Sequence, residues 1–445
     1  MADGNKKAAA ERSWRITGAL ILDPFTGREG QGTVWVEAGR VVERPSGAFP
    51  EETVEASGLW LIPRLTDIHV HFRSPGQEWK EDLRSGSMAA AAGGFTVVAT
   101  MPNTDPVVDI PALVAWQRLE AERLGLVRVW PIGAISVGLQ GKALADLWAM
   151  QEAGAVGFSD DGRPVADSRL MRAALSYSRS LTGPIIQHAE DPGLFAGASM
   201  HEGSVSHRMG IPGAPAEAES VMVWRDVQLA ALTGGRLHIA HLSAPGSLEA
   251  LAWAKRRGLQ VTAEATPHHL LLTDEAVAEW GYDAVTKVNP PLRPAAMREA
   301  LVEAVREGLV EVIASDHAPH HADEKGRPYT EAPFGISGLE TSLGAVLTAL
   351  VHGGLLSPLE AMRRMTAFPH RLLGQAYPGL VPGAPADLTL VDPFHEWTVD
   401  PGRFYSKGKN TPLAGARLRG RAVATMVDGC WVMREGEVID PCADN

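Results

Sequence analysis

Short apolar runs alternate with longer amphipathic stretches over most of this chain. Eight short runs are rich in Val, Ile, Leu, Phe and Ala, and the segments between them are rich in Ala, Leu, Glu and Arg, several ending in Gly. Such apolar runs are typical of buried strands, and the segments between them are typical of helices with a C-terminal glycine. The eight expected strands are residues 65–71, 95–101, 126–132, 155–158, 184–188, 236–241, 259–265 and 310–316.

This alternation predicts a (β/α)8 TIM-type barrel, because repeated strand–helix units build a parallel sheet that closes at eight strands. The pattern changes at both ends of the chain. Residues 13–62 and 378–445 contain β-branched residues that alternate with polar ones between Gly-containing turns, as half-buried antiparallel strands do. We therefore expect the barrel over residues 63–377, a small β-sandwich domain formed by both chain ends, and a disordered tail over residues 1–12.

The composition restricts the classes of function. A formal net charge of -12 disfavours nucleic acid or an anionic membrane as a partner. No run approaches the ~20 apolar residues that cross a bilayer, and the N-terminal segment lacks the apolar core of a signal peptide. The two cysteines, Cys430 and Cys442, fit a reducing cytoplasm and exclude a thiolate metal cluster. Any metal ion must then be held by histidine and carboxylate side chains.

Histidines and aspartates follow five of the expected strands. In a barrel of this kind the loops after the C-terminal ends of the strands form the active site, so these side chains should converge. Taken singly, each has an ordinary interpretation as a core histidine or a turn aspartate. Together they predict a site for zinc or a related divalent ion, in which positions i and i+2 of the first strand present two imidazoles to one ion. The residues are His69, His71, Asp160, Asp161, His188, His241 and Asp316.

The remaining polar residues near these strand ends predict a hydrolytic reaction on an anionic substrate. Asp316 ends the last strand, where a carboxylate can both hold a metal and exchange a proton with water that the metal activates. Arg73, Asn103 and His320 offer donors to a substrate carboxylate, although Arg73 alone fits a surface salt bridge equally well. The polar segment 321–332 is expected to be a mobile loop over the site. The other histidines, His238 among them, are expected to be structural or exposed.

Sequence motifs along the whole chain resemble those of the dihydroorotase family, in its long bacterial form, within the amidohydrolase superfamily. The resemblance covers residues 16–438. It rests on "DIHVHFRSPG", "KEDLRSGSMAAAAGGFTVVATMPNT", "GFSDDGRPV", "QHAED", "HIAHLS", "TAEATPHHLLLT", "KVNPPLR", "ASDHAPH", "EAPFGISGLET" and the closing "FYSKGKNTPLAGARLRGRAVATMVDG".

The resemblance implies a reaction and a set of residue roles. The reaction is the reversible ring closure of N-carbamoyl-L-aspartate to dihydroorotate in pyrimidine biosynthesis. In the ring-opening direction, a zinc-activated hydroxide attacks the ring amide carbonyl, and Asp316 acts as proton shuttle. One or two zinc ions are implied, as are a homo-oligomer and aspartate transcarbamoylase as a partner. The implied metal ligands are His69, His71, Asp161, His188, His241 and Asp316. The implied substrate contacts are Arg73, Asn103, Asn289, His320, Phe334 and Gly335.

Two alternatives stay open. Hydantoinases and allantoinases bridge two metals with a carboxylated lysine after the fourth strand, whereas this chain has no lysine between Lys142 and Lys255 and places Asp161 there. An inactive assembly partner of aspartate transcarbamoylase has lost metal histidines, whereas every ligand position is filled here. The chain departs from the family pattern at Arg64, where glycine is usual, and at Ser74, where glutamate is common.

Overall fold

A computed structural model of the chain describes residues 12–47 and 51–439, so the expected tail lies, except for its last residue, outside the described part. All eight expected barrel strands are present and pair in parallel in the order β15-β14-β13-β10-β9-β8-β7-β6. The prediction of eight βα units is therefore confirmed. The strands are β6 (Thr66–Val70), β7 (Val97–Thr100), β8 (Arg128–Gly133), β9 (Gly157–Ser159), β10 (Ile185–Gln187), β13 (Leu237–Ile239), β14 (Val261–Ala265) and β15 (Val312–Ile313).

A buried side chain helps to close the barrel between its first and last strands. The carboxylate of Asp67, in β6, accepts hydrogen bonds from the N–H of Ser315 at 3.0 and 3.1 Å. The N–H of His71 donates to the carbonyl of His317 at 2.8 Å. Because these contacts join the C-terminal ends of β6 and β15, predicted metal ligands from the first and last barrel strands become neighbours.

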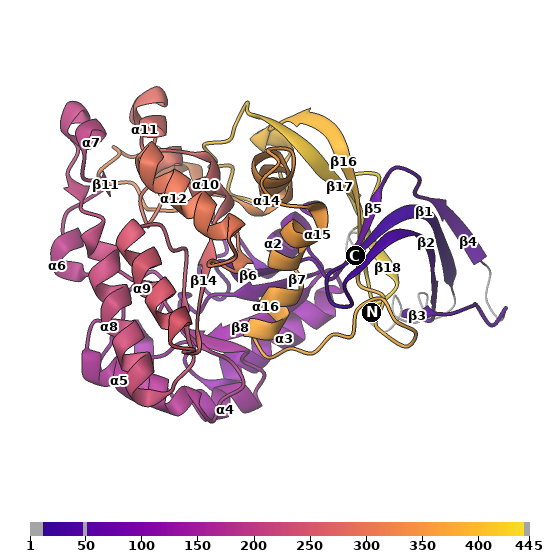
Figure 1. Ribbon diagram of the computed structural model, residues 1–445, viewed down its shortest axis with the longest axis horizontal. Coiled ribbons are helices and arrows are strands. Elements are labelled where there is room, and N and C mark those ends of the chain that lie inside the picture. The colour runs from indigo at the N-terminus through magenta and orange to yellow at the C-terminus, as the bar shows by residue number, and fades with distance from the viewer. Residues whose placement is uncertain (1–11, 48–50, 440–445) are drawn as a thin grey trace.

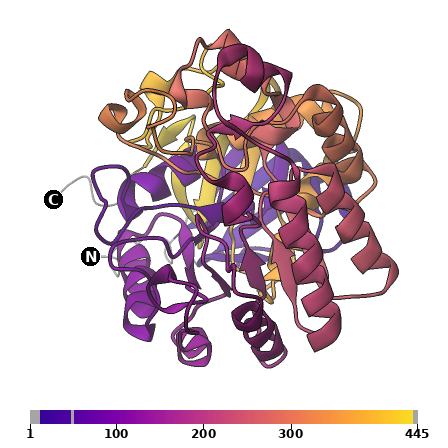
Figure 2. The same ribbon diagram turned by 90° about the vertical axis from the view of Figure 1, so that its left-hand side faces the viewer.

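Helices cover the outer face of the barrel strands, as Figures 1 and 2 show from two directions. The barrel interior holds its own apolar cluster, which includes Ile68, Ala99, Ile132, Ile186 and Val312. A larger cluster lies between the strands and the helices. The site is therefore built at the strand ends, above a filled core.

The helices, with the short segments between them, are α2 (Leu83–Ala92), α3 (Pro111–Leu124), η1 (Val137–Leu139), α4 (Leu147–Glu152), α5 (Ser168–Ser178), α6 (Pro192–Phe195), β11 (Met200–His201), α7 (Ser204–Met209), β12 (Gly213–Ala214), α8 (Glu217–Thr233), α9 (Pro245–Arg256), α10 (Pro267–Leu271), α11 (Glu275–Glu279), η2 (Ala284–Thr286), α12 (Ala295–Arg306), α13 (Ala322–Lys325), α14 (Leu339–Val346), η3 (Leu347–Val351), α15 (Pro358–Arg364), α16 (Ala367–Leu372) and η4 (Pro401–Arg403).

The two chain ends form the expected β structure as one nine-stranded sheet. A continuous hydrogen-bonded path links eight of its strands in the order β19-β18-β17-β16-β5-β1-β2-β3, and β4 pairs with β1. Its buried side chains, among them Ile16, Leu61 and Met426, make a separate core. Figure 1 shows this sheet at one side of the barrel. Its strands are β1 (Ser13–Asp23), β2 (Arg28–Glu37), β3 (Arg40–Val42), β4 (Glu51–Glu55), β5 (Trp60–Pro63), β16 (Leu388–Thr398), β17 (Arg417–Val427), β18 (Cys430–Arg434) and β19 (Glu437–Val438).

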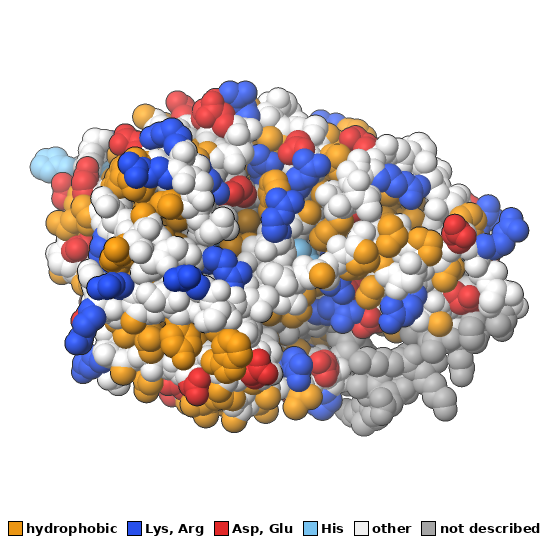
Figure 3. Space-filling view, turned by 60° about the horizontal axis from the view of Figure 1, so that its bottom comes forward, with side chains coloured by type: hydrophobic (Ala, Val, Ile, Leu, Met, Phe, Trp, Pro, Cys, Tyr) orange, Lys and Arg blue, Asp and Glu red, His pale blue; other side chains and the backbone are white. Residues whose placement is uncertain are grey.

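The surface carries mixed charge. On the face in Figure 3, Lys and Arg side chains are interspersed with Asp and Glu. Within the described ranges, no helix combines the length and the apolar character needed to cross a membrane.

Candidate metal centre and substrate site

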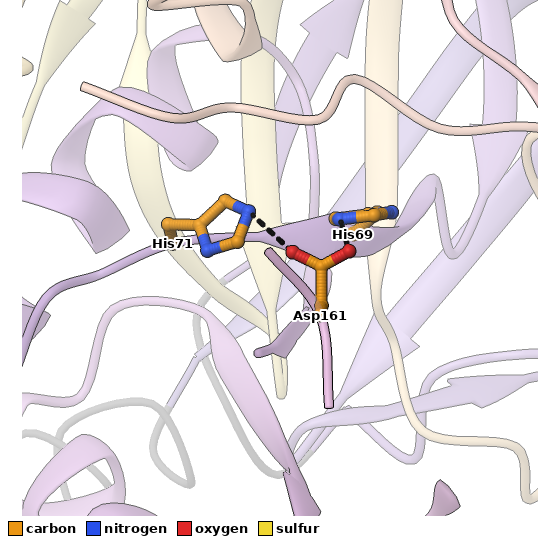
Figure 4. A group of neighbouring side chains, drawn as sticks. All are labelled: His69, His71 and Asp161. Atoms are coloured by element: carbon orange, nitrogen blue, oxygen red, sulfur yellow. Dashed lines mark ion pairs between the residues drawn. The ribbon is translucent and has the colours of Figure 1, made fainter. Parts of the chain in front are cut away.

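The first two predicted ligands share one carboxylate. His69 lies in β6 and His71 directly follows it; their Nε2 atoms lie 3.4 Å from Oδ1 and Oδ2 of Asp161, respectively. All three side chains are buried. Figure 4 shows the carboxylate placed between the two rings, with an ion pair drawn to each. Because the three ligand atoms lie within 4.8 Å of one another, one cation can contact all of them.

A second pair of imidazoles meets the same carboxylate. His188 follows β10 and His241 follows β13; Nδ1 of His188 and Nε2 of His241 lie 3.6 and 3.5 Å from Oδ1 of Asp161. Asp161 is thus common to two groups of three residues that could hold a metal ion. Asp160 instead accepts two backbone N–H groups shortly after β8, at 2.9 Å each, and so fixes that loop.

Asp316 lies beside the first pair. Its Oδ1 is 3.2 Å from Nε2 of His71 and 3.6 Å from Nε2 of His69. The next residue, His317, accepts an N–H at the start of α14 and places its Nε2 3.3 Å from the buried carboxylate of Glu81. These contacts hold the segment that carries Asp316 against the end of β6.

The hydrogen bonds on the far side of each ring fix the imidazole protons of the first pair. Nδ1 of His69 lies 2.5 Å from Oε1 of Glu264, and Nδ1 of His71 lies 2.8 Å from Oδ1 of Asn103. Carboxylate and amide oxygens only accept, so each Nδ1 carries a hydrogen. In the neutral ring, Nε2 then presents a lone pair to the oxygens of Asp161. Lone pairs that face one another in this way are stabilised by a cation between them.

The buried polar atoms at this point fit a metal cofactor. Nε2 of His69, Oδ1 of Asp161 and Nδ1 of His241 are buried and have no hydrogen-bond partner among residues 12–47 and 51–439. Burial raises the pKa of Asp161, but the positive charge of the neighbouring His69 and the other imidazoles around the carboxylate outweigh burial and hold this pKa well below its usual value. Burial lowers the pKa of His69, but Asp161 and Glu264 outweigh it and hold this pKa well above its usual value. The site therefore favours positive charge, as a divalent cation supplies.

Arg73 is a buried cation next to this centre. Its Nε donates to the carbonyl of Pro319 at 3.3 Å, and its Nη2 lies 3.4 Å from Nε2 of His320. Burial lowers the pKa of Arg73 to about 10, although Asp316 and Asp161 favour its charge, so the guanidinium is charged at neutral pH. No ion pair joins Arg73 to a carboxylate within the described part of the chain. An anionic ligand is the partner that such a group lacks.

Phe334 and Gly335, whose backbone is predicted to contact substrate, are hydrogen-bonded to distant segments of the chain. Nε2 of His320 lies 2.8 Å from the carbonyl of Phe334, and the N–H of Gly335 donates to the carbonyl of Lys287 at 2.9 Å. Asn410 accepts from the N–H of His320 at 3.1 Å and donates to the carbonyl of Gly335 at 3.0 Å. The Gly335 N–H is therefore already bonded within the protein.

Asn103 and Asn289, both predicted to contact substrate, contact groups around the predicted metal ligands. Besides bonding the neighbouring imidazole, Asn103 donates to the carbonyl of Asp161 at 3.2 Å. Asn289 donates to Oε2 of Glu190 at 2.7 Å, and its Nδ2 lies 3.2 Å from Nε2 of His188. The structure thus brings both residues to the site, and their contacts with a substrate stay predictions.

The segment 321–332 contains helix α13 and two buried anchors, Lys325 and Tyr329. Nζ of Lys325 donates to the carbonyl of Pro333 at 2.9 Å. The anchors hold the segment against the loop that carries Phe334. Its mobility without ligand stays a prediction.

The sequence pattern missed three residues that support the site by hydrogen bonds, Glu264, His238 and Asn410. Glu264 hydrogen-bonds His69, and His238, expected to be structural, lies 3.1 Å from the same carboxylate. A carboxylate inside an apolar strand was the available signal for Glu264, because such a group needs a buried partner. Asn410 gave no comparable signal, since it lies 90 positions along the chain from the histidine whose N–H it accepts.

A (β/α)8 barrel with His and Asp ligands at its C-terminal rim defines a metal-dependent hydrolase of the amidohydrolase type. Residues 58–247 match a family model described as "Dihydro-orotase-like". A dihydroorotase of Pelotomaculum thermopropionicum is 49% identical over 424 residues, which cover 94% of this chain and 98% of that protein; one of Anaeromyxobacter sp. (strain K) is 46% identical, covering 95% and 98%. The chain belongs to the dihydroorotase family.

Two solved structures share the whole architecture of this chain. The L-hydantoinase (dihydropyrimidinase) of Arthrobacter aurescens superposes with a TM-score of 0.84 at 25% identity and covers 96% of this chain and 97% of its own. The dihydropyrimidinase of Brevibacillus agri gives 0.81 at 20% identity, covering 96% of each chain, and supports the fold alone.

Proposed function

We propose that this protein is a zinc-dependent dihydroorotase that interconverts N-carbamoyl-L-aspartate and (S)-dihydroorotate. Family membership supports the reaction class. The observation that carries the choice of substrate is the buried, unpaired guanidinium of Arg73 beside Asp316. Dihydroorotate has an exocyclic carboxylate to pair with it, whereas hydantoin and allantoin have none.

The chain's own residues supply orientation and proton transfer. The guanidinium of Arg73, with His320 next to it, binds the exocyclic carboxylate and so turns one ring carbonyl toward Asp161 and the four imidazoles. Asp316 takes a proton from the attacking water and delivers it to the departing ring nitrogen. Burial raises the pKa of Asp316, but His69 and His71 outweigh burial and lower it, so the residue starts as a base at neutral pH.

The metal, when bound, polarises the ring carbonyl and lowers the pKa of water. We assign it to His69, His71, Asp161 and Asp316, with a further ion at Asp161, His188 and His241. Zinc is the choice because the donor set is imidazole and carboxylate without sulfur. Asp161 lies within 3.6 Å of all four imidazoles, so its carboxylate would be shared by the two groups of residues.

The test compares turnover of dihydroorotate, hydantoin and allantoin by the purified protein together with its metal content. We expect turnover of dihydroorotate alone, and loss of metal and activity in His69→Ala. Arg73→Met should lower kcat/KM for dihydroorotate by about 10- to 100-fold, the loss of a charge-assisted hydrogen bond. Arg169→Met, at an exposed position on α5, is the matched control.

The same measurements decide between the alternatives. Preferred turnover of hydantoin or allantoin, with Arg73→Met unaffected, would make the protein a different cyclic-amide hydrolase. Absence of both metal and turnover would leave an inactive assembly partner. Self-association, binding to aspartate transcarbamoylase and a cytoplasmic location also stay predictions, and sedimentation of the chain alone and mixed with that enzyme tests the first two.

A further inference from the structure

Glu264 is a buried carboxylate whose described side-chain partners are histidines. It lies in β14, which carries no predicted ligand, and is 1% exposed. Its Oε1 is 2.5 Å from Nδ1 of His69, and its Oε2 is 3.1 Å from Nε2 of His238. A buried carboxylate is expensive to retain unless it is paired, so these histidines account for its stability there.

The hydrogen bonds continue in one direction away from the metal centre. Because Glu264 accepts from His238 Nε2–H, Nδ1 of His238 is an acceptor, and it lies 2.8 Å from the hydroxyl of Thr262. His238 is fully buried. The hydrogen-bonded series Thr262–His238–Glu264–His69 therefore has a donor for each acceptor. It leaves Nε2 of His69 facing Asp161.

The other imidazoles of the site lack this support. His71 bonds a neutral amide oxygen on its far side. Nε2 of His188 is 3.6 Å from the nearest oxygen of Glu190, beyond hydrogen-bond distance, and Nδ1 of His241 has no hydrogen-bond partner among the described residues. His69 alone thus has a carboxylate at hydrogen-bond distance behind it.

We propose that Glu264 is a positioning residue that fixes the His69 ring and strengthens its Nε2 as a metal donor. A carboxylate behind an imidazole selects one tautomer and increases the basicity of the other nitrogen. The group of His69, His71 and Asp161 then binds its ion more tightly than the group of Asp161, His188 and His241. This inference rests on the metal centre of the proposed function.

The test is competition for zinc between the full-length holoenzyme and a chelator of known affinity. Glu264→Gln keeps the size of the side chain and removes its charge, and we expect the first zinc equivalent to bind about 10- to 100-fold more weakly. Glu249→Gln, exposed on α9, is the matched control and should leave the affinity unchanged. A role in folding alone would instead lower the melting temperature of the chelated protein and leave the zinc affinity unaltered.

Thr262→Val gives a milder second variant should Glu264→Gln fail to fold. It removes the hydroxyl behind His238 and should weaken zinc binding in the same direction by a smaller factor. Zinc affinity equal to that of the unmodified protein, in a folded Glu264→Gln or otherwise in Thr262→Val, would overturn the inference. Failure of the unmodified protein to bind zinc would overturn the proposed function itself, so the two failures are distinguishable.

Discussion

Replacing Arg64 by glycine separates two opposing contributions to stability. Arg64 joins β5 of the sheet to β6 of the barrel with φ +44°, in the left-handed region that favours glycine. Its Nε donates to Oδ2 of the buried Asp387 at 2.7 Å, and its guanidinium lies 4.4 Å from the ring centre of Tyr377. The side chain therefore stabilises a backbone conformation that it does not itself favour.

The expected magnitude follows from these contacts. Glycine removes about 1–2 kcal/mol of backbone strain. It also removes a charged hydrogen bond, about 1.5–3 kcal/mol, and a desolvated cation–π contact, about 2 kcal/mol. Arg128 still donates to Asp387 at 2.8 Å, so the aspartate keeps one charged partner. Arg64→Gly should thus be destabilising by about 2–3 kcal/mol, and Arg64→Ala, which keeps the strain, by about 1 kcal/mol more.

Urea unfolding followed by circular dichroism measures both variants. Ala38→Gly is the matched control for strain, since Ala38 is exposed with φ +50° and loses no polar contact; it should gain up to about 1 kcal/mol. The reasoning is refuted if Arg64→Gly is more stable than the unmodified protein, or if Arg64→Ala is no less stable than Arg64→Gly.

Three further predictions concern pH, backbone conformation and the metal. Burial raises the pKa of Glu340 from 4.5 to about 7, so the folded state binds this proton more tightly and the stabilisation present at low pH is lost as pH rises through 7. The free energy of unfolding of Glu340→Gln relative to the unmodified protein should therefore rise by up to ~3 kcal/mol between about pH 4.5 and 8; a pH-independent difference would contradict this. Gly335 has φ +125°, and Gly335→Ala would place a Cβ 2.7 Å from the carbonyl oxygen of Ala318. The KM for dihydroorotate should therefore rise while metal content stays constant, and an unchanged KM would count against the site. Chelation should abolish turnover and lower the melting temperature, with zinc restoring both; full activity of metal-free protein would disprove the metal-assisted reaction.

The barrel, and the residue types of the candidate metal site, could be predicted from the sequence because both predictions depend on local pattern. Each barrel strand is a short apolar run, and a parallel sheet buried on both faces requires such runs wherever they fall in the chain. His69 and His71 share a face through the two-residue period of a strand, whatever surrounds them. The same local reasoning located Asp316 at the end of the last strand.

Tertiary structure decided how these residues meet. It put Asp161 between two imidazole pairs, placed Glu264 behind His69, and brought Asn410, from the segment between β16 and β17, to His320. Each of these contacts depends on barrel closure or on domain packing, which set distances between residues far apart in the chain. The sequence by itself therefore determined which chemical groups are available, and only the packed structure determined which of them touch. The reason is that side-chain contact depends on position in space, whereas sequence periodicity shows only which face of one helix or strand a side chain occupies.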